Sequence, residues 1–170
     1  MIALIGTHGT GKTTLLSALA EVRPELIITD GDSRVVRGYN KAIGGKLMPR
    51  EQQLLINTLS DARWERDLRV ENLVCTRTPL DHYAYCKAFG WQDLAETRLE
   101  LFRKSDYLKS KFFYLPIEFE IEDDGVRYTN PDLQKDVDQS LVHYAEYFKL
   151  NPITLSGSVE ERLDKLLSNI

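Results

Sequence analysis

Short apolar runs alternate with longer stretches in which apolar residues recur every three or four positions. The apolar runs predict five β-strands, at residues 1–5, 26–29, 73–76, 112–115 and 153–155. The stretches between them predict helices at residues 13–22, 33–43, 49–70, 80–89, 93–103, 131–149 and 159–168. Strands that alternate with helices are typical of an α/β fold with a parallel sheet. We therefore expect three layers, a five-stranded parallel sheet with helices on both faces.

Two of the predicted helices carry enough apolar residues to propose which side faces the core. In the helix at 131–149 the spacing selects Leu133, Val137, Leu141, Tyr144 and Phe148. In the helix at 49–70 the expected core contacts are Leu54, Leu55, Leu59, Ala62 and Leu68.

The turn after the first strand carries a phosphate-binding motif. Residues 6–13 read GTHGTGKT, which satisfies G-x-x-x-x-G-K-[ST], with an apolar strand before it and a helix after it. Backbone N–H groups of such a P-loop surround phosphate oxygens, Lys12 reaches the β- and γ-phosphates, and the Thr13 hydroxyl ligates Mg²⁺. The predicted nucleotide-binding residues are Gly6, Thr7, His8, Gly9, Thr10, Gly11, Lys12, Thr13 and Thr14. The motif predicts binding of ATP with Mg²⁺, but it does not separate a kinase from a switch or an ATPase.

Charged residues follow the second predicted strand. Ligands gather at the carboxyl ends of parallel strands, so Asp30, Asp32 and Arg34 are expected near the γ-phosphate. One aspartate would accept a proton from an attacking hydroxyl or hold a water on Mg²⁺, and Arg34 would contact substrate. Capping of the next helix is the alternative role of Asp32. The sequence does not rank the two aspartates firmly and slightly favours Asp32 as the catalytic one.

The third predicted strand ends at Thr76, where many P-loop proteins place an acidic residue that supports Mg²⁺. Arg77 follows and is expected to reach bound phosphate or the phosphoryl acceptor. Asp81 either belongs to the acceptor site, pairs with Arg77 or caps a helix.

Residues 116–130 form a candidate lid over the phosphates. Arg127 would act there as an arginine finger in cis, and a solvated hairpin-like excursion is the alternative. The acidic residues of this segment alternate with Phe119 and Ile121, which favours a strand with one wet face over a metal cluster. Near the end of the chain, the loop at 156–161 is the expected place for adenine, and Arg162 would stack on its ring.

Composition adds limits on the function. The 170 residues suit one domain spanning the whole chain, and the formal charge of −4 argues against a broad basic nucleic-acid-binding face. No apolar run approaches the ~18 residues of a membrane span, and MIALIG does not resemble a signal peptide, so we expect a cytoplasmic protein without a membrane partner. Cys75 and Cys86 are expected to be buried free thiols.

Several motifs together resemble a known family. GTHGTGKTTLL, RTPLDHYAY, YLP and DDGVR are similar to segments of small P-loop kinases of the ribosylnicotinamide-kinase-like group, many of them phage-encoded and some called thymidylate-kinase-like. The resemblance implies a nucleoside- or nucleotide-kinase fold with a lid. It also implies that Arg77 and Asp81 belong to the acceptor side and Arg127 to the lid. The chain departs from the family pattern in two places. Thr76 stands where Asp is common, and Asp30-Gly31-Asp32-Ser33-Arg34 stands where a Glu-x-x-Arg-like arrangement is usual.

Three functions remain open from the sequence. The first is an ATP-dependent phosphotransferase acting on a nucleoside, a nucleoside monophosphate or a related small acceptor. The second is a kinase acting on DNA or RNA, at an end or at a modified base. The third is a P-loop ATPase or switch that has no phosphoryl acceptor except water. The protein is expected in the cytoplasm, or in the cytoplasm of the host if the chain is phage-encoded. The sequence leaves the oligomeric state open.

Overall fold

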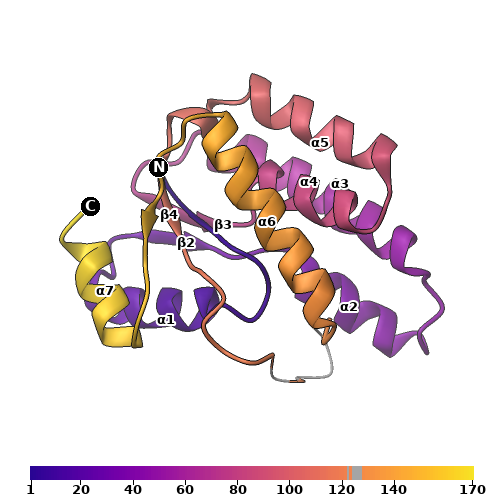
Figure 1. Ribbon diagram of the computed structural model, residues 1–170, viewed down its shortest axis with the longest axis horizontal. Helices are drawn as coiled ribbons and strands as arrows, with labels where there is room; N and C mark the ends of the chain where they lie inside the picture. Colours follow the sequence, from indigo (N-terminus) through magenta and orange to yellow (C-terminus); the bar gives the residue numbers. More distant parts are fainter. Residues whose placement is uncertain (122, 124–127) are drawn as a thin grey trace.

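A five-stranded parallel sheet forms the centre of the protein (Figure 1), in a computed structural model that describes residues 1–121, 123 and 128–170. The strand order is β2-β3-β1-β4-β5, and every pairing is parallel. The strands are β1 (Ile2–Ile5), β2 (Ile27–Thr29), β3 (Leu73–Thr76), β4 (Lys111–Tyr114) and β5 (Ile153–Thr154). The predicted fold class is therefore confirmed, with each strand boundary within one residue of its expected place.

Helices cover both faces of the sheet (Figure 1). One face carries α1 (Lys12–Val22) and α7 (Val159–Leu167). The other carries α3 (Pro49–Asp67), α4 (Pro79–Ala88), α5 (Gln92–Lys104) and α6 (Pro131–Tyr147). The remaining elements are α2 (Ser33–Ala42), which follows β2, and a 3₁₀ turn at Asp106–Lys109.

Side chains of successive strand residues point to opposite faces of the sheet, and they contribute to two separate hydrophobic cores. Ala3 and Ile5 point to the face packed by α3–α6, whereas Leu4 points to the face packed by α1 and α7. Because both faces are covered, the central strands are apolar throughout, which is why they could be recognised as short apolar runs. Cys75 and Cys86 are buried and free, as predicted.

The prediction for α3 is wrong about which side faces inward. The five expected core residues are all exposed, for example Leu59 at 44%. The buried side is mostly polar and consists of Gln53, Ile56, Asn57, Ser60, Arg63, Trp64 and Asp67. These polar groups are satisfied by one another and by the ends of β2 and β3, so their burial is tolerated. In α6, by contrast, Leu133, Val137 and Leu141 are buried as predicted.

The segment after β4 also differs from its prediction. Residues 116–121 form no strand, so the expected strand with one wet face is wrong. Glu118 instead bonds to the backbone N–H of Gly157 (2.9 Å) and to Arg162 (2.6 Å), which draws the segment toward α7. Arg127 and the middle of the candidate lid lie outside the described residues. Among the residues that are described, none of the helices has the length and apolar character to cross a membrane.

Candidate functional site

The P-loop takes its shape from glycine at two positions. A Cβ on Gly6 would lie 2.7 Å from the carbonyl oxygen of Leu115, so a side chain there would collide with the backbone beyond β4. Gly11 has a φ of 83° and forms the N-terminal boundary of α1, a left-handed conformation that side chains disfavour. The loop therefore turns directly from β1 into α1, and its backbone lies at the positive end of that helix.

Lys12 is folded over this loop. Its side chain is only 6% exposed, and its Nζ donates to the Thr10 hydroxyl (2.9 Å) and to the Thr7 carbonyl oxygen. Burial lowers the pKa of the Lys12 ammonium well below its ordinary value, and the positive charge of Arg77 lowers it further. A polyphosphate beside Nζ would act in the opposite direction and favour the charged form.

His8, inside the motif, is held from two helices. Its N–H donates to the Tyr85 hydroxyl of α4 (3.0 Å), and its carbonyl oxygen accepts from Gln134 of α6 (2.8 Å). The His8 Nδ1 also lies 2.9 Å from the Tyr85 oxygen. His8 therefore fixes the loop to the rest of the protein, and its N–H is already engaged.

Arg162 of α7 supports the loop from the side. It is 2% exposed, and its Nη1 donates to the Thr10 carbonyl oxygen (2.7 Å) while its guanidinium lies 4.9 Å from the centre of the Phe119 ring. The residue thus stacks on an aromatic ring of the protein. It also lines a shallow hollow together with Thr14, Phe119, Gly157 and Val159, among others. This hollow lies beside the P-loop, in the region where the sequence placed adenine.

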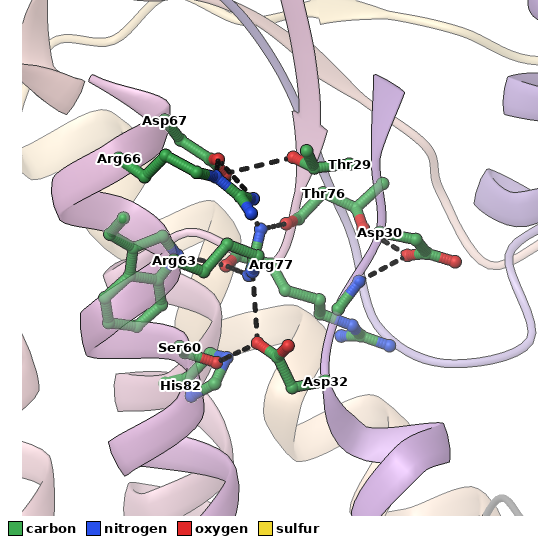
Figure 2. A network of polar contacts seen from close by, with 12 residues as sticks. Thr29, Asp30, Asp32, Ser60, Arg63, Arg66, Asp67, Thr76, Arg77 and His82 are labelled. Carbon is green, nitrogen blue, oxygen red and sulfur yellow. Dashed lines mark hydrogen bonds and ion pairs between the residues drawn. The ribbon is translucent and has the colours of Figure 1, made fainter. Parts of the chain in front are cut away.

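Asp30 connects the P-loop with the sheet. Its carboxylate accepts from the Thr13 hydroxyl (2.9 Å) and from the Gly31 N–H (2.7 Å). It also accepts from the Thr76 hydroxyl at the end of β3 (Figure 2). Desolvation alone would raise the pKa of Asp30, but the hydrogen bonds from Thr76, Gly31 and Thr13 outweigh it and lower the pKa below its ordinary value. An ionised carboxylate from the end of β2 therefore lies beside the residue expected to bind Mg²⁺. It also contacts Thr76 at the end of β3, the position where many P-loop proteins have an acidic residue.

Asp32 points toward Ser60 and Arg63 of α3 (Figure 2). Its Oδ2 accepts from the Ser60 hydroxyl (2.6 Å) and from Arg63 Nε (3.0 Å). Arg63 also reaches Asp67 (3.3 Å), which in turn accepts from Thr29 (3.0 Å). Asp32 precedes α2, but its side chain caps no helix N–H. The structure thus places Asp32 in a network that joins β2 to α3.

Arg77 lies at the end of β3 in a left-handed backbone conformation, with a φ of 62°. Its carbonyl oxygen accepts from Arg63 (3.2 Å) and Trp64 (3.0 Å), which holds this strained residue in place. The guanidinium lies over the Tyr85 ring and 3.9 Å from Asp81. Asp81 is fully buried and accepts from the Thr78 N–H and hydroxyl, both at 2.9 Å, so it caps α4.

Many of the predicted site residues line one cleft, but Asp81 and Arg162 are not part of its lining. The P-loop residues His8 to Thr14 line it together with the segment Asp30 to Arg34, Arg37 and Arg77. Part of the lining was not predicted from the sequence, namely Arg37, Gln53, Ile56, His82 and Tyr85. Arg37 lies three residues after Arg34, so the two arginines share one side of α2.

The inner wall of the cleft contains a chain of buried polar groups. Asn57 Oδ1 accepts from Gln53 Nε2 (2.9 Å) and lies 2.9 Å from His82 Nδ1. This pairing places the proton on Nδ1 and leaves Nε2 as an acceptor, 3.5 Å from the Ser60 oxygen. Burial lowers the pKa of His82 well below its ordinary value, and Arg63 and Arg77 lower it further. The recurrence of polar residues at positions 53, 57, 60 and 67 of α3 is the sequence pattern that could have predicted this polar wall.

Comparison with known proteins identifies the family. A sequence model described as an AAA domain matches residues 1–162. The chain belongs to the AAA domain family. No curated protein matches its sequence significantly.

Solved structures share the fold of this AAA domain. Deoxyadenosine kinase from M. mycoides superimposes with a TM-score of 0.65 at 12% identity, covering 98% of this chain and 96% of the kinase. Thymidylate kinase from Candida albicans gives a TM-score of 0.68 at 17% identity, covering 98% and 88% respectively. At these identities the similarity establishes a P-loop kinase fold for the AAA domain, as the family resemblance implied.

Proposed function

We propose that this AAA domain is an ATP-dependent phosphotransferase that moves the γ-phosphoryl group to a nucleoside, a nucleoside monophosphate or a related small acceptor. One observation carries the proposal. The P-loop and a separate set of charged side chains, from the ends of β2 and β3 and from α2, line the same cleft. A donor nucleotide and an acceptor can therefore lie next to each other, which is the main requirement for phosphoryl transfer.

The nucleotide side fits ATP. Phosphates would bind at the P-loop backbone and at Lys12, which would exchange its contacts with Thr7 and Thr10 for phosphate oxygens. We place the adenine ring in the hollow lined by Thr14, Phe119 and Val159, where Arg162 supplies part of the wall. Phe119 and Glu120, from the segment after β4, line this hollow.

Thr13 and Asp30 fit a magnesium ion. Their oxygens are hard ligands, 2.9 Å apart, and Asp30 is ionised. The described part of the chain contains no group of three or more His, Cys, Asp or Glu residues that would hold a metal unaided. Such a site suits Mg²⁺, which commonly uses one or two protein ligands together with substrate phosphates. When bound, the ion would neutralise charge on the transferring group.

Positioning and electrostatics would supply most of the rate enhancement. Lys12 of the P-loop and Arg77, directly after β3, both line the cleft. Arg77 would supply positive charge to a moving phosphoryl group, and Lys12 would do so in the charged form that a bound polyphosphate favours. Arg127 remains a prediction for the lid. We assign Asp30 to the metal and Asp32 to the network that positions β2 against α3.

The proposal is tested by incubating the protein with γ-labelled ATP and Mg²⁺ against nucleosides, nucleoside monophosphates, ribosylnicotinamide and oligonucleotides. Transfer of label to a small acceptor is the expected result. Transfer to oligonucleotides alone would support the nucleic-acid kinase instead. If protein that binds an ATP analogue transfers label to none of them, phosphotransfer is excluded.

A P-loop ATPase without an acceptor is the second candidate. Membership of the AAA domain family is compatible with it, because a fold and its P-loop do not by themselves fix a phosphoryl acceptor. Release of inorganic phosphate at a rate that no acceptor changes would decide for this candidate.

A further inference from the structure

Three arginines line the acceptor side of the cleft: Arg34 and Arg37 from α2, and Arg77 from the end of β3. The carboxylates among the described lining residues are Asp30 and Asp32. Asp32 is paired with Arg63, which lies outside the cleft lining, and Asp30 accepts from Thr13, Thr76 and Gly31. The protein has a formal charge of −4, so this positive region is a local feature of the site.

Arg77 is positioned in advance by its surroundings. Arg63 and Trp64 hold its carbonyl oxygen, and the Tyr85 hydroxyl lies 3.4 Å from its Nη1. Among the described carboxylates it forms one ion pair, a long one of 3.9 Å to Asp81 Oδ1, whereas the two hydrogen bonds from Thr78 go to Asp81 Oδ2. The side chain stem also requires a glycine opposite, since a Cβ on Gly31 would lie 2.3 Å from Arg77 Cγ. A guanidinium held in this way is suited to bind an anion.

The cleft is poorly arranged to activate a hydroxyl acceptor. A hydroxyl must lose a proton during phosphoryl transfer. Asp30 accepts hydrogen bonds at both carboxylate oxygens, and Asp32 is held toward α3 by Ser60 and Arg63 through its Oδ2. Burial also weakens His82 as a base, since its pKa is well below the ordinary value. A phosphate ester avoids the requirement, because its second pKa is about 6 and it is largely a dianion at neutral pH.

We infer that the acceptor is itself a phosphate ester of the nucleoside-monophosphate class, whose phosphate binds Arg77 with support from Arg34 and Arg37. The inference rests on the phosphotransferase function proposed above and narrows its acceptor. In the reaction, an oxygen of the acceptor phosphate forms a bond to the γ-phosphorus of ATP. The bond from that phosphorus to the β,γ-bridging oxygen breaks, and the products are ADP and a nucleoside diphosphate. No proton has to leave the acceptor.

The first experiment compares each nucleoside with its own 5′-monophosphate as acceptor of labelled phosphate from ATP, for the common bases with ribose and deoxyribose. We expect kcat/KM for a monophosphate to exceed that of its nucleoside by about 100-fold or more, as expected for two charge-assisted hydrogen bonds. Nucleosides that are phosphorylated as well as their monophosphates would overturn the inference but leave the proposed function standing. A 5′-phosphorylated oligonucleotide preferred over every monophosphate would also overturn it.

The second experiment measures monophosphate binding at equilibrium in the presence of a non-hydrolysable ATP analogue. Arg77→Gln should weaken monophosphate binding at least about tenfold and leave nucleoside binding unchanged. Arg77→Lys should recover only part of the loss, because lysine lacks the planar fork. Arg37→Gln, on the more exposed α2, should give a smaller loss. Binding of the ATP analogue shows that each variant is folded.

Arg103→Gln is the matched control, since Arg103 lies on α5 in an exposed pair with Glu100. It should change neither affinity. Equal loss of monophosphate and nucleoside binding in Arg77→Gln would contradict a phosphate contact. Absence of monophosphate binding to wild-type protein that binds the analogue would contradict the inference, and hydrolysis of ATP without transfer to any acceptor would remove the proposed function as well.

Discussion

The two sides of the cleft are built by different means. The nucleotide side consists mainly of one continuous segment, residues 6–14, whose backbone is shaped by glycines between β1 and α1. The acceptor side consists of side chains from the ends of β2 and β3 and from α2, α3 and α4. Backbone N–H groups are suited to bind the polyphosphate, because that part of the donor nucleotide is the same in every reaction cycle. Side chains from several elements instead allow each acceptor to be recognised by its own chemistry.

Helix α3 shows the cost of building the acceptor side in this way. Its inner face contacts Asp32, Arg77 and His82 mainly through polar residues, and Leu54, Leu55 and Leu59 are left outside. The network around Arg63 shows how this burial remains tolerable, because each charged group has partners from a neighbouring element (Figure 2).

Loss of the Lys12 ammonium should have the largest effect. Lys12→Ala should lower phosphoryl transfer by about 10³-fold or more, since it removes the P-loop charge that stabilises the transferring group. Labelled-phosphate transfer measures the effect, and circular dichroism checks the fold. Lys104→Ala, on the surface of α5, is the control. Activity near the wild-type value in Lys12→Ala would refute the assignment of the nucleotide side.

Neutralising the carboxylate between the two sides should have the next largest effect. Asp30→Asn should lower turnover by about 10–100-fold and raise the Mg²⁺ concentration needed for half-maximal rate, because an ionised group beside Thr13 is lost. A titration of rate against Mg²⁺ measures this. An unchanged Mg²⁺ requirement would show that Asp30 does not support the metal.

Gly31 tests the fit between the ends of β2 and β3. Gly31→Ala should displace the Arg77 stem and weaken acceptor binding by about tenfold, with ATP-analogue affinity unchanged. Gly38→Ala in α2 is the matched control, because a Cβ there meets nothing within 4 Å and should only favour the helix. If both variants bound the acceptor like wild type, the close approach of Gly31 and Arg77 would have no functional role.

The dependence of the unfolding free energy on pH, measured in the acid range, should reveal the lowered pKa of Asp30. Its contribution to the free energy of unfolding is present above its ordinary pKa of about 4 and is lost as the pH falls through the lower folded value. Asp30→Asn should therefore flatten the dependence of the unfolding free energy on pH below about pH 4. Urea unfolding across that range measures the difference. Parallel curves for the two proteins would contradict the assigned ionisation.

The outer face of α3 should give the smallest effect. Leu59→Gln should change the free energy of unfolding by less than about 0.5 kcal/mol, because Leu59 is exposed. Ile56→Ala, on the buried face one turn earlier, should cost about 2–5 kcal/mol. A large loss in Leu59→Gln would show that this face is covered in solution.

The sequence alone determined the strands, the parallel α/β fold and the P-loop. These follow from local rules, since a buried strand must be apolar and a phosphate cradle needs glycines at fixed positions in one segment. Tertiary structure decided the acceptor side. Whether Asp30 turns to Thr13 or Asp32 turns to Arg63 depends on which helix packs against the end of β2. The same packing explains why the polar side of α3 faces inward. A polar group can be buried when a segment distant in the sequence supplies its hydrogen-bond partner, and no local sequence pattern records that partner.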